Sequence, residues 1–328
     1  MSIAGPSQGA KAPLGGGAAH AVASVGATFP VCIIGVGNMG GGMAQRLAGL
    51  GWSPVVHDLD ADKVRKFLPF GAVAPVDIAK AASKSVATIV CVVDAVQTRD
   101  VLFGPDGIAA GLPKGHVVVL CPTIAPQDVE GIASELAVMG VDTVDAPMSG
   151  GPARARDGSM SLMVACPDEV FERCQPLLQA LSSKLFRISE RVGDGARTKL
   201  VNNLLAGINL VGAAEVLALA DRMGLNLSRT LDVIEQSSGQ SWIASDRMRR
   251  AISGDLEPRA HMTLLAKDTR LALEAAAALD FEGPLGAQAS ATFADAVQAG
   301  LAERDDGALL GFLAQKNRNP VVRGSKGR

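Results

Sequence analysis

The segment that decides the fold reads Val31-Cys32-Ile33-Ile34-Gly35-Val36-Gly37-Asn38-Met39-Gly40. Its four leading apolar residues predict a buried strand, and a helical pattern follows the glycines directly. In this setting Gly35 permits a tight turn, Gly37 lets the backbone approach a pyrophosphate, and Gly40 lets the helix pack on the strand. The start of the helix adds free N–H groups and a positive dipole end. The segment therefore predicts a dinucleotide site formed by Gly35, Gly37, Asn38, Met39 and Gly40.

The next expected strand, Ser53–His57, leads into Asp58, which lies 18 residues beyond Gly40. A carboxylate at this place can accept hydrogen bonds from the adenosine ribose hydroxyls, and it repels a 2′-phosphate. Neither of the next two residues is an arginine, so NAD is favoured over NADP. Arg65 would favour NADP instead, because its side chain could reach back from the following helix to a 2′-phosphate. A glycine-rich turn followed by a capping aspartate is the alternative that needs no ligand.

The rest of the chain divides into two parts by its periodicity. Short runs rich in β-branched residues alternate with Ala-rich helical patterns as far as residue 192, and the runs expected to be strands are Val31–Ile34, Ser53–His57, Ala87–Val93, Val117–Cys121, Asp142–Asp145 and Ser161–Ala165. Beyond them only helical patterns remain, over residues 196–223, 228–253, 260–279 and 284–300. The sequence thus predicts an α/β fold: a Rossmann domain with a doubly wound, mostly parallel sheet over residues 30–192, then an all-α domain over 193–317. Residues 1–29 are expected to form a flexible tail and residues 318–328 a basic tail.

The composition excludes several classes of function. The 328 residues include no tyrosine and four histidines, so dehydrogenases that rely on a Tyr-Lys pair are excluded. A net charge of −2 gives no electrostatic footprint for nucleic acid or an anionic membrane surface. The longest apolar stretches, residues 86–93 and 117–121, are too short to cross a bilayer. We therefore expect neither nucleic acid nor a membrane as a partner.

The five cysteines show no CxxC spacing and lie mostly in apolar runs. This pattern is typical of buried thiols in a reducing compartment. We expect a cytoplasmic protein with no disulfide and no metal site.

A second polar segment, Asp145-Ala-Pro-Met-Ser-Gly-Gly151, follows the strand expected at Asp142–Asp145. Ser149, Gly150 and Gly151 would expose successive N–H groups and one hydroxyl, which together make a small nest for an anion such as a carboxylate. A plain turn explains the segment equally well.

Lys199 lies in the first turns of the long helix, and Asn202 and Asn203 follow it at helical spacing. All three are expected on one face of the helix. The N-terminal end of a helix disfavours a cation and lowers its pKa, which suits an acid/base lysine, although a solvated lysine is the simpler reading of this segment alone. Lys267-Asp268 is a similar case, and neighbours in a helix are not expected to bond to each other across its face.

Taken in order, these segments resemble the 3-hydroxyacid (β-hydroxyacid) dehydrogenase family, whose members include 3-hydroxyisobutyrate dehydrogenase. The resemblance covers residues 31 to about 313, and the segments that carry it are Gly35–Gly40 with Met43-Ala44, Thr123-Ile-Ala-Pro126, Asp145–Gly151 with Gly158, Gly193-x-Gly195-x3-Lys199-x2-Asn202-Asn203, and Lys267-Asp268. Within the family, three stretches are closer to the L-threonate dehydrogenase branch: Gln97–Gly104, Leu204–Gly207 with Ala214-Glu215, and Ser238–Trp242.

The resemblance implies roles for individual residues. It makes Lys199 the general acid/base, Ser149, Gly150 and Gly151 the carboxylate site, and Asn203 the residue that orients the substrate. It places Thr123 beside the nicotinamide and lets Lys267 close the pocket over substrate and cofactor. Two segments depart from the family pattern: Cys121-Pro122 replaces two small polar residues, and Ala165-Cys166 replaces a Gly-Gly pair. The first departure puts contacts at the nicotinamide end in doubt.

The resemblance further implies NAD-dependent oxidation of a small hydroxy acid, with L-threonate, oxidised at C2, as the preferred substrate. The alternatives are 3-hydroxyisobutyrate and tartronate semialdehyde (2-hydroxy-3-oxopropanoate). Outside the enzyme class, the fold could serve as a catalytically silent NAD-binding module, and Lys199 argues against this.

Finally, the long helix carries apolar residues on more than one face, which predicts a homodimer or homotetramer. These residues include Leu204, Leu205, Ile208, Val211, Leu217 and Leu219.

Overall fold

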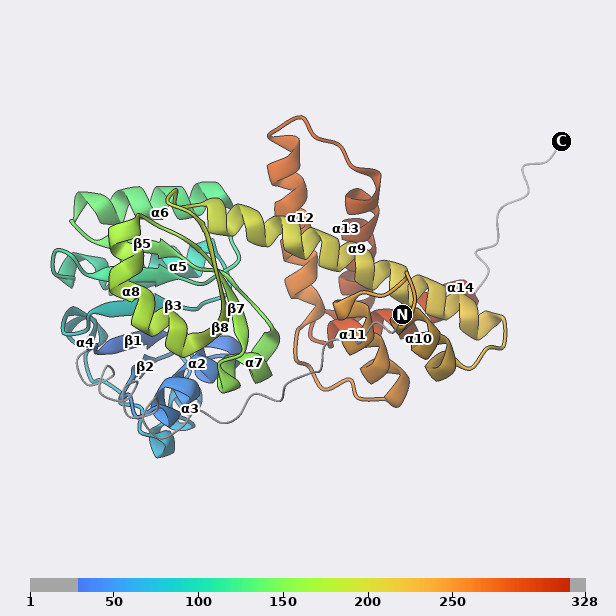
Figure 1. Ribbon diagram of the computed structural model, residues 1–328, viewed down its shortest axis with the longest axis horizontal. Helices are drawn as coiled ribbons and strands as arrows, with labels where there is room; N and C mark the ends of the chain where they lie inside the picture. Colours follow the sequence, from blue (N-terminus) through green and yellow to red (C-terminus); the bar gives the residue numbers. More distant parts are fainter. Residues whose placement is uncertain (1–28, 319–328) are drawn as a thin grey trace, which may run out of the picture.

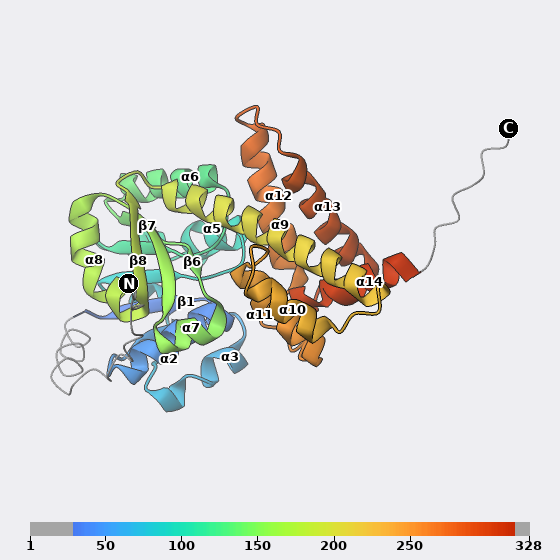
Figure 2. The ribbon, with the colours of Figure 1, turned by 45° about the vertical axis from the view of Figure 1, so that its right-hand side comes forward.

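The computed structural model describes residues 29–318, so the two expected tails lie outside the described residues except for Phe29 and Arg318. The first part of the chain is a sheet covered by helices on both faces, and the second part is a bundle of helices (Figure 1). This is the predicted Rossmann domain followed by an all-helical domain. The long helix α9 (Asp194–Arg222) starts against the sheet and crosses the whole second domain (Figures 1 and 2).

The sheet has the order β2-β1-β3-β4-β5-β7-β6, with β8 added beside β7. Its strands are β1 (Val31–Ile34), β2 (Val55–His57), β3 (Ala87–Val90), β4 (Val117–Leu120), β5 (Asp142–Asp145), β6 (Met148–Ser149), β7 (Met160–Ala165) and β8 (Ser182–Ser189). The first five pair in parallel, whereas β7 runs antiparallel to β5 and β6 and parallel to β8. All six predicted strands are present, and the mostly parallel sheet is confirmed.

Burial on both faces explains the continuous apolar runs of β1, β3 and β4, because helices cover each side of the sheet. One face packs on α2 (Asn38–Gly49), α7 (Gly151–Asp157) and α8 (Asp168–Leu181). The other packs on α4 (Ile78–Ser83), α5 (Ala95–Phe103), α6 (Pro126–Val138) and the start of α9. A short helix, α3 (Ala61–Arg65), follows β2. The carboxyl ends of the parallel strands meet at one edge, where ligands bind in folds of this kind.

The helical domain packs around α9. Its other helices are α10 (Leu227–Glu235), α11 (Trp242–Ser253), α12 (Met262–Ala277), α13 (Pro284–Ala296) and α14 (Leu309–Arg318). The single helix expected over 228–253 is in fact two, because the Ser241 side chain caps a new helix by accepting the N–H of Ala244. The pattern expected over 284–300 leaves the α conformation after Ala296 and continues as a π-helical turn in which Gly300 has φ +88°.

By length and apolar composition, α9 could cross a membrane, although the uninterrupted apolar stretches of the sequence are too short to indicate this. In the structure α9 packs against α11, α12, α13 and α14 and forms the core of its domain. The five cysteines are free thiols, and four of them are buried.

Candidate active site

The glycine-rich turn after β1 has the shape that the sequence predicts. Gly35 has φ +90°, and a Cβ there would lie 2.5 Å from the carbonyl oxygen of Cys91. A Cβ at Gly40 would lie 1.9 Å from the carbonyl oxygen of Gly35. A Cβ at Gly37 would meet nothing within 4 Å, and both Gly37 and Asn38 are exposed. The protein itself thus requires two of the three glycines, and the third leaves open a place where a pyrophosphate fits at the N-terminus of α2.

Asp58 lies at the end of β2, beside this turn. Its Oδ2 accepts the N–H of Val36 at 3.0 Å, so the same carboxylate also holds the glycine-rich turn. Lys63 Nζ lies 3.8 Å from Asp58 Oδ1, and Arg65 is paired with Asp62 instead. The cation that approaches Asp58 is therefore Lys63, which the sequence analysis did not single out.

The segment from Ser149 to Gly151 turns sharply between β6 and α7. Gly150 has φ +131° and Gly151 has φ +73°, conformations that favour glycine at both positions. All three residues are partly exposed, so the turn itself lies at the surface of the described chain. A turn of this kind can present successive N–H groups to an anion, so the predicted nest stays a prediction for these three residues.

Arg154 on α7 extends from this nest toward the helical domain. A Cβ at Gly150 would lie 2.7 Å from Arg154 Cδ, so the side chain runs alongside the turn. Its guanidinium carbon lies 5.1 Å from the ring centroid of Trp242, the first residue of α11. Figure 2 shows α7 and α11 next to each other across the two domains. This contact was missed from the sequence, because Arg154 lies in the last turn of α7, where a cation is ordinary, and its partner is on another helix.

Lys199 is buried, with 7% of its surface exposed. The pKa of Lys199 is lowered to about 8, chiefly by burial; Asp268 opposes the shift and nearby Lys267 adds to it. The predicted depression is thus present, but its main cause is desolvation rather than the helix terminus. A group with a pKa of about 8 is available in both protonation states near neutral pH.

The two asparagines after Lys199 do not share one environment. Asn203 is half-buried and donates from Nδ2 to Asp268 Oδ2 at 2.6 Å. Asn202 is exposed and donates to Asn203 Oδ1 at 3.0 Å. The arrangement directs Lys199 and Asn203 toward α12, and it leaves Asn202 in solvent.

Lys267 and Asp268 form an ion pair, so the expectation that neighbours on a helix could not pair was wrong. Lys267 Nζ lies 2.9 Å from Asp268 Oδ1, although the geometry is not that of a hydrogen bond. The same ammonium donates to the carbonyl oxygen of Thr123, at the end of β4. Lys267 thereby joins the helical domain to the carboxyl edge of the sheet. Asp268 is buried between two lysines, so the cluster has a net positive charge when Lys199 is protonated and none when Lys199 is neutral.

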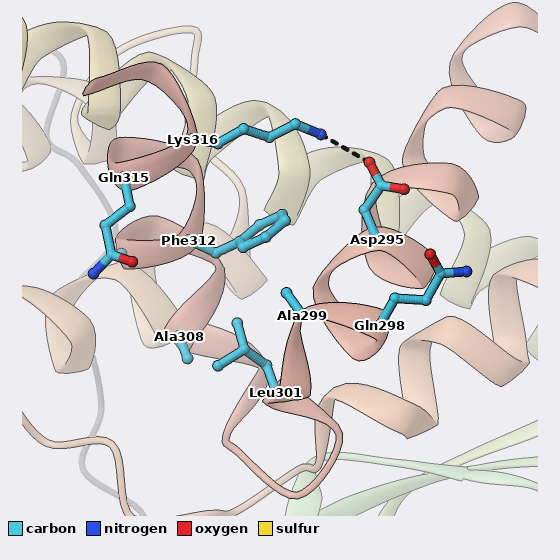
Figure 3. Close-up of a pocket in the computed structure, with 9 residues that line it drawn as sticks. Asp295, Gln298, Ala299, Leu301, Ala308, Phe312, Gln315 and Lys316 are labelled. Atoms are coloured by element: carbon cyan, nitrogen blue, oxygen red, sulfur yellow. Dashed lines mark hydrogen bonds and ion pairs between the residues drawn. The ribbon is translucent and has the colours of Figure 1, made fainter. Parts of the chain in front are cut away.

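A separate cavity of about 700 Å³ lies between α13, the π-helical turn and α14 (Figure 3). Phe312 lies in its wall, and Lys316 pairs with Asp295 at 2.8 Å across one side. None of the predicted site residues lines it. Among residues 29–318 there is no group of three or more His, Cys, Asp and Glu side chains that could hold a metal ion.

Comparisons with known proteins cover nearly the whole described chain. The family model for the NAD binding domain of 6-phosphogluconate dehydrogenase matches residues 30–189. The model for the NAD-binding domain of NADP-dependent 3-hydroxyisobutyrate dehydrogenase matches residues 193–313. These matches assign NAD(P) binding to the chain.

Among individual proteins, the L-threonate dehydrogenase of Escherichia coli K12 is 37% identical over 286 residues, which are 87% of this chain and 95% of that protein. The mitochondrial 3-hydroxyisobutyrate dehydrogenase of Bos taurus is 30% identical over 89% of each chain. The crystal structure of 3-hydroxyisobutyrate dehydrogenase from Salmonella typhimurium superposes with a TM-score of 0.81 at 35% identity, over 87% of this chain and 99% of that one. Psf3 in complex with NADP+ and 2-OPP has a TM-score of 0.81 at 30% identity, over 86% and 99% of the two chains.

Proposed function

This chain belongs to the 3-hydroxyacid dehydrogenase family and is an NAD(P)-dependent oxidoreductase of hydroxy acids, and from this premise we propose that it oxidises L-threonate at C2 to the 2-oxo acid. The observation that carries the proposal is the buried Lys199 with its pKa of about 8, enclosed by Asn203, Asp268 and Lys267. The 37% identity to the L-threonate dehydrogenase of Escherichia coli K12 supports the choice of acid.

In the proposed reaction each residue binds the substrate, orients it or transfers a proton. The N–H groups of Ser149–Gly151 bind the substrate carboxylate, and Asn203, fixed by Asp268, orients the hydroxyl at C2. Neutral Lys199 takes the hydroxyl proton on Nζ, and its low pKa makes the neutral amine accessible near pH 8. Lys267 holds the two domains together at Thr123, where we place the nicotinamide end. The cofactor, when bound, supplies the acceptor for the hydride that leaves C2.

We propose NAD as the preferred cofactor, because Asp58 lies at the end of β2 and repels a 2′-phosphate. The Asp58→Ala variant should show a ratio of kcat/KM for NAD to kcat/KM for NADP about tenfold below that of the wild type. Lys63, 3.8 Å from Asp58, would then be free to attract the extra phosphate. The ratio is the readout because any unfolded fraction cancels from it.

Asp60→Ala is the matched control for this measurement. Asp60 is a neighbouring carboxylate that caps α3 by accepting the N–H of Asp62, and it does not hold the glycine-rich turn. Its variant should keep the wild-type ratio. An unchanged ratio in Asp58→Ala would show that Asp58 does not select the cofactor.

The choice of acid is tested by NADH formation with a panel of three- and four-carbon hydroxy acids. L-threonate should give the highest kcat/KM, above 3-hydroxyisobutyrate. In the reverse direction, with NADH supplied, tartronate semialdehyde should be reduced less efficiently than the 2-oxo acid of L-threonate. A different best acid would leave the reaction class standing and replace the substrate. If NAD binds and no acid is turned over, the chain is the silent binding module instead.

We also propose a homodimer or homotetramer, built on the side of α9 that its own domain leaves uncovered. Leu217 and Val211 are buried, but several apolar residues of the same helix are exposed: Val201, Leu205, Val216, Leu219 and Met223. We place the boundary between the two domains after residue 192, so that they span residues 30–192 and 193–317.

The five free thiols fit a reducing compartment, which for this chain we take to be the cytoplasm.

A further inference from the structure

Asp145, the last residue of β5, is 1% exposed and bonds to the start of α9. Its Oδ2 accepts the N–H of Gly193 at 2.9 Å and the N–H of Ala196 at 3.0 Å. Two of the N–H groups that a helix leaves without partners in its first turn are thus satisfied by a strand nearly 50 residues earlier in the sequence.

The helix cannot provide this cap itself. Its N-cap residue is Gly193, which has φ +100° and no side chain. At Gly195 a Cβ would lie 2.9 Å from Asp145 Oδ2 and 2.7 Å from the carbonyl oxygen of Met163, so the first turn sits directly on the ends of β5 and β7. Only glycine allows this close approach, and the carboxylate therefore fixes where α9 begins.

Both halves of the candidate site start from this contact. Ser149, the first residue of the anion nest, is four residues beyond Asp145 in one direction of the chain. Lys199 is three residues beyond Ala196, less than one helical turn from the bonded N–H. A small displacement of the first turn of α9 would move Lys199 relative to the nest.

We propose that Asp145 is a positioning residue, whose carboxylate holds the first turn of α9 on β5 and so keeps Lys199 opposite the Ser149–Gly151 nest. The inference rests on the proposed function, because only that function gives the distance between Lys199 and the nest a catalytic meaning. Asp145 touches neither substrate nor cofactor in this account, and it acts through Lys199.

The ionisation of Asp145 makes this role visible in a pH profile. Burial raises the pKa of Asp145 to about 6, the N–H groups of Ala196, Gly193 and Gly195 oppose the shift, and Asp194 adds to it. The groups that face it from the sheet are the thiols of Cys121 and Cys166, which burial keeps neutral. Beside Gly193, the carboxylate of Glu130 on α6 is paired with Arg197 at 2.7 Å.

Below about pH 6 the carboxyl takes up a proton, and its bonds to the two N–H groups weaken because they lose their charge. Because the folded pKa lies above the unfolded value, this protonation does not itself destabilise the fold. In the direction of 2-oxo acid reduction, Lys199 must enter protonated, which holds below its pKa of about 8. An acidic limb near pH 6 in that direction therefore does not come from Lys199, and the proposal assigns it to Asp145. Asp306, whose pKa burial also raises to about 6, pairs with Arg247 on α11, and a limb that came from Asp306 would remain in Asp145→Asn.

The test is the pH dependence of kcat for reduction of the 2-oxo acid by NADH, in the wild type and in Asp145→Asn. The wild type should lose activity above about pH 8 and again below about pH 6. Asp145→Asn accepts the same N–H groups without a charge, so its kcat should be about tenfold lower at neutral pH, with no acidic limb and an unchanged KM for NADH. Survival of the acidic limb in Asp145→Asn would overturn the proposal.

Asp194→Asn is the matched control. It removes a carboxylate from the same helix terminus, but Asp194 bonds to Ser189, Arg191 and Arg197 rather than to the first-turn N–H groups. This variant should keep both limbs, with the acidic one moved slightly to lower pH because Asp194 raises the pKa of Asp145. Loss of the acidic limb here as well would assign it to the general charge of the terminus and would contradict the proposal.

A second measurement stands even if Asp145→Asn fails to fold or no acid in the panel is turned over. Hydrogen exchange of the wild type, corrected for intrinsic rates, should show that the N–H groups of Gly193, Gly195 and Ala196 lose protection between about pH 7.5 and about pH 5. These bonds favour the charged form of Asp145, so its protonation favours a local opening that breaks them while Asp145 stays buried. The N–H groups in the first turn of α12 should keep the same protection at both pH values. Equal protection of α9 at both pH values would contradict the role of Asp145, whereas failure of turnover alone would contradict only the proposed function.

Discussion

Replacement of Lys199 by alanine is expected to lower kcat for L-threonate oxidation about 10³-fold, while NAD still binds. Lys199 is the buried amine beside Asn203 and Asp268, and no ion pair holds it elsewhere in the described chain. Its removal takes away the acceptor of the hydroxyl proton but none of the glycine-rich turn. Steady-state kinetics together with NAD titration by fluorescence would separate the two effects.

Two further variants make this result specific. Lys199→Arg keeps a cation but cannot give up its proton, so it should be as inactive in oxidation as the alanine variant. Lys184→Ala removes an exposed lysine of β8 and should leave kcat unchanged. If Lys199→Ala retains more than about a tenth of wild-type kcat, another group carries the proton.

The pH dependence of the wild-type rate tests the same residue, because its direction depends on which form of Lys199 is active. Oxidation needs neutral Lys199, so its rate should rise with pH and level off above the pKa of about 8. An oxidation rate that falls through this range would be incompatible with a lysine base.

Replacement of Gly37 by valine is expected to weaken NAD binding about 100-fold without a change in Tm. A Cβ at Gly37 meets nothing within 4 Å, and the φ of −66° there lies outside the left-handed region that favours glycine. We expect a bound dinucleotide to take this open space, so the substitution should affect binding and not the fold. Calorimetric titration and thermal unfolding would measure the two quantities on the same samples.

Two other glycines serve as controls for this prediction. Gly131 on α6 also has nothing within 4 Å of its Cβ position but lies on a helix away from the turn, so Gly131→Val should keep NAD affinity. At Gly40 a Cβ would collide with the carbonyl oxygen of Gly35 at 1.9 Å, so Gly40→Ala should lower Tm as well as affinity. Unchanged affinity in Gly37→Val would place the cofactor somewhere other than this turn.

Much of the fold could be predicted because its strongest signals are local. The strands β1, β3 and β4 are buried on both faces, so they read as short apolar runs. The strand β8 was missed because only one of its residues is fully buried and it carries charged residues, and β6 because it has only two residues. The break between α10 and α11 depends on one serine cap, which a search for periodicity passes over.

The candidate site shows the same difference between features made by one segment and features made by several. The glycine turn, Asp58 and the Ser149–Gly151 nest are each made by one continuous segment, and spacing alone predicts them. The ion pair of Lys267 with Asp268, the contact of Lys267 with Thr123, and the stacking of Arg154 on Trp242 depend on how side chains fold back or meet across separate elements. Asp145 was part of a predicted motif, but its bonds to α9 join residues 48 and 51 positions apart, which no local pattern contains.

The most direct test of the account uses L-threonate that carries deuterium at C2. Incubation of the wild-type protein with this substrate and NAD, followed by mass spectrometry of the reduced cofactor, follows the hydrogen that leaves the carbinol carbon. The account predicts one deuterium in each NADH formed, and no such product with Lys199→Ala on the same timescale. Unlabelled NADH, or equal deuterium transfer by Lys199→Ala, would contradict it.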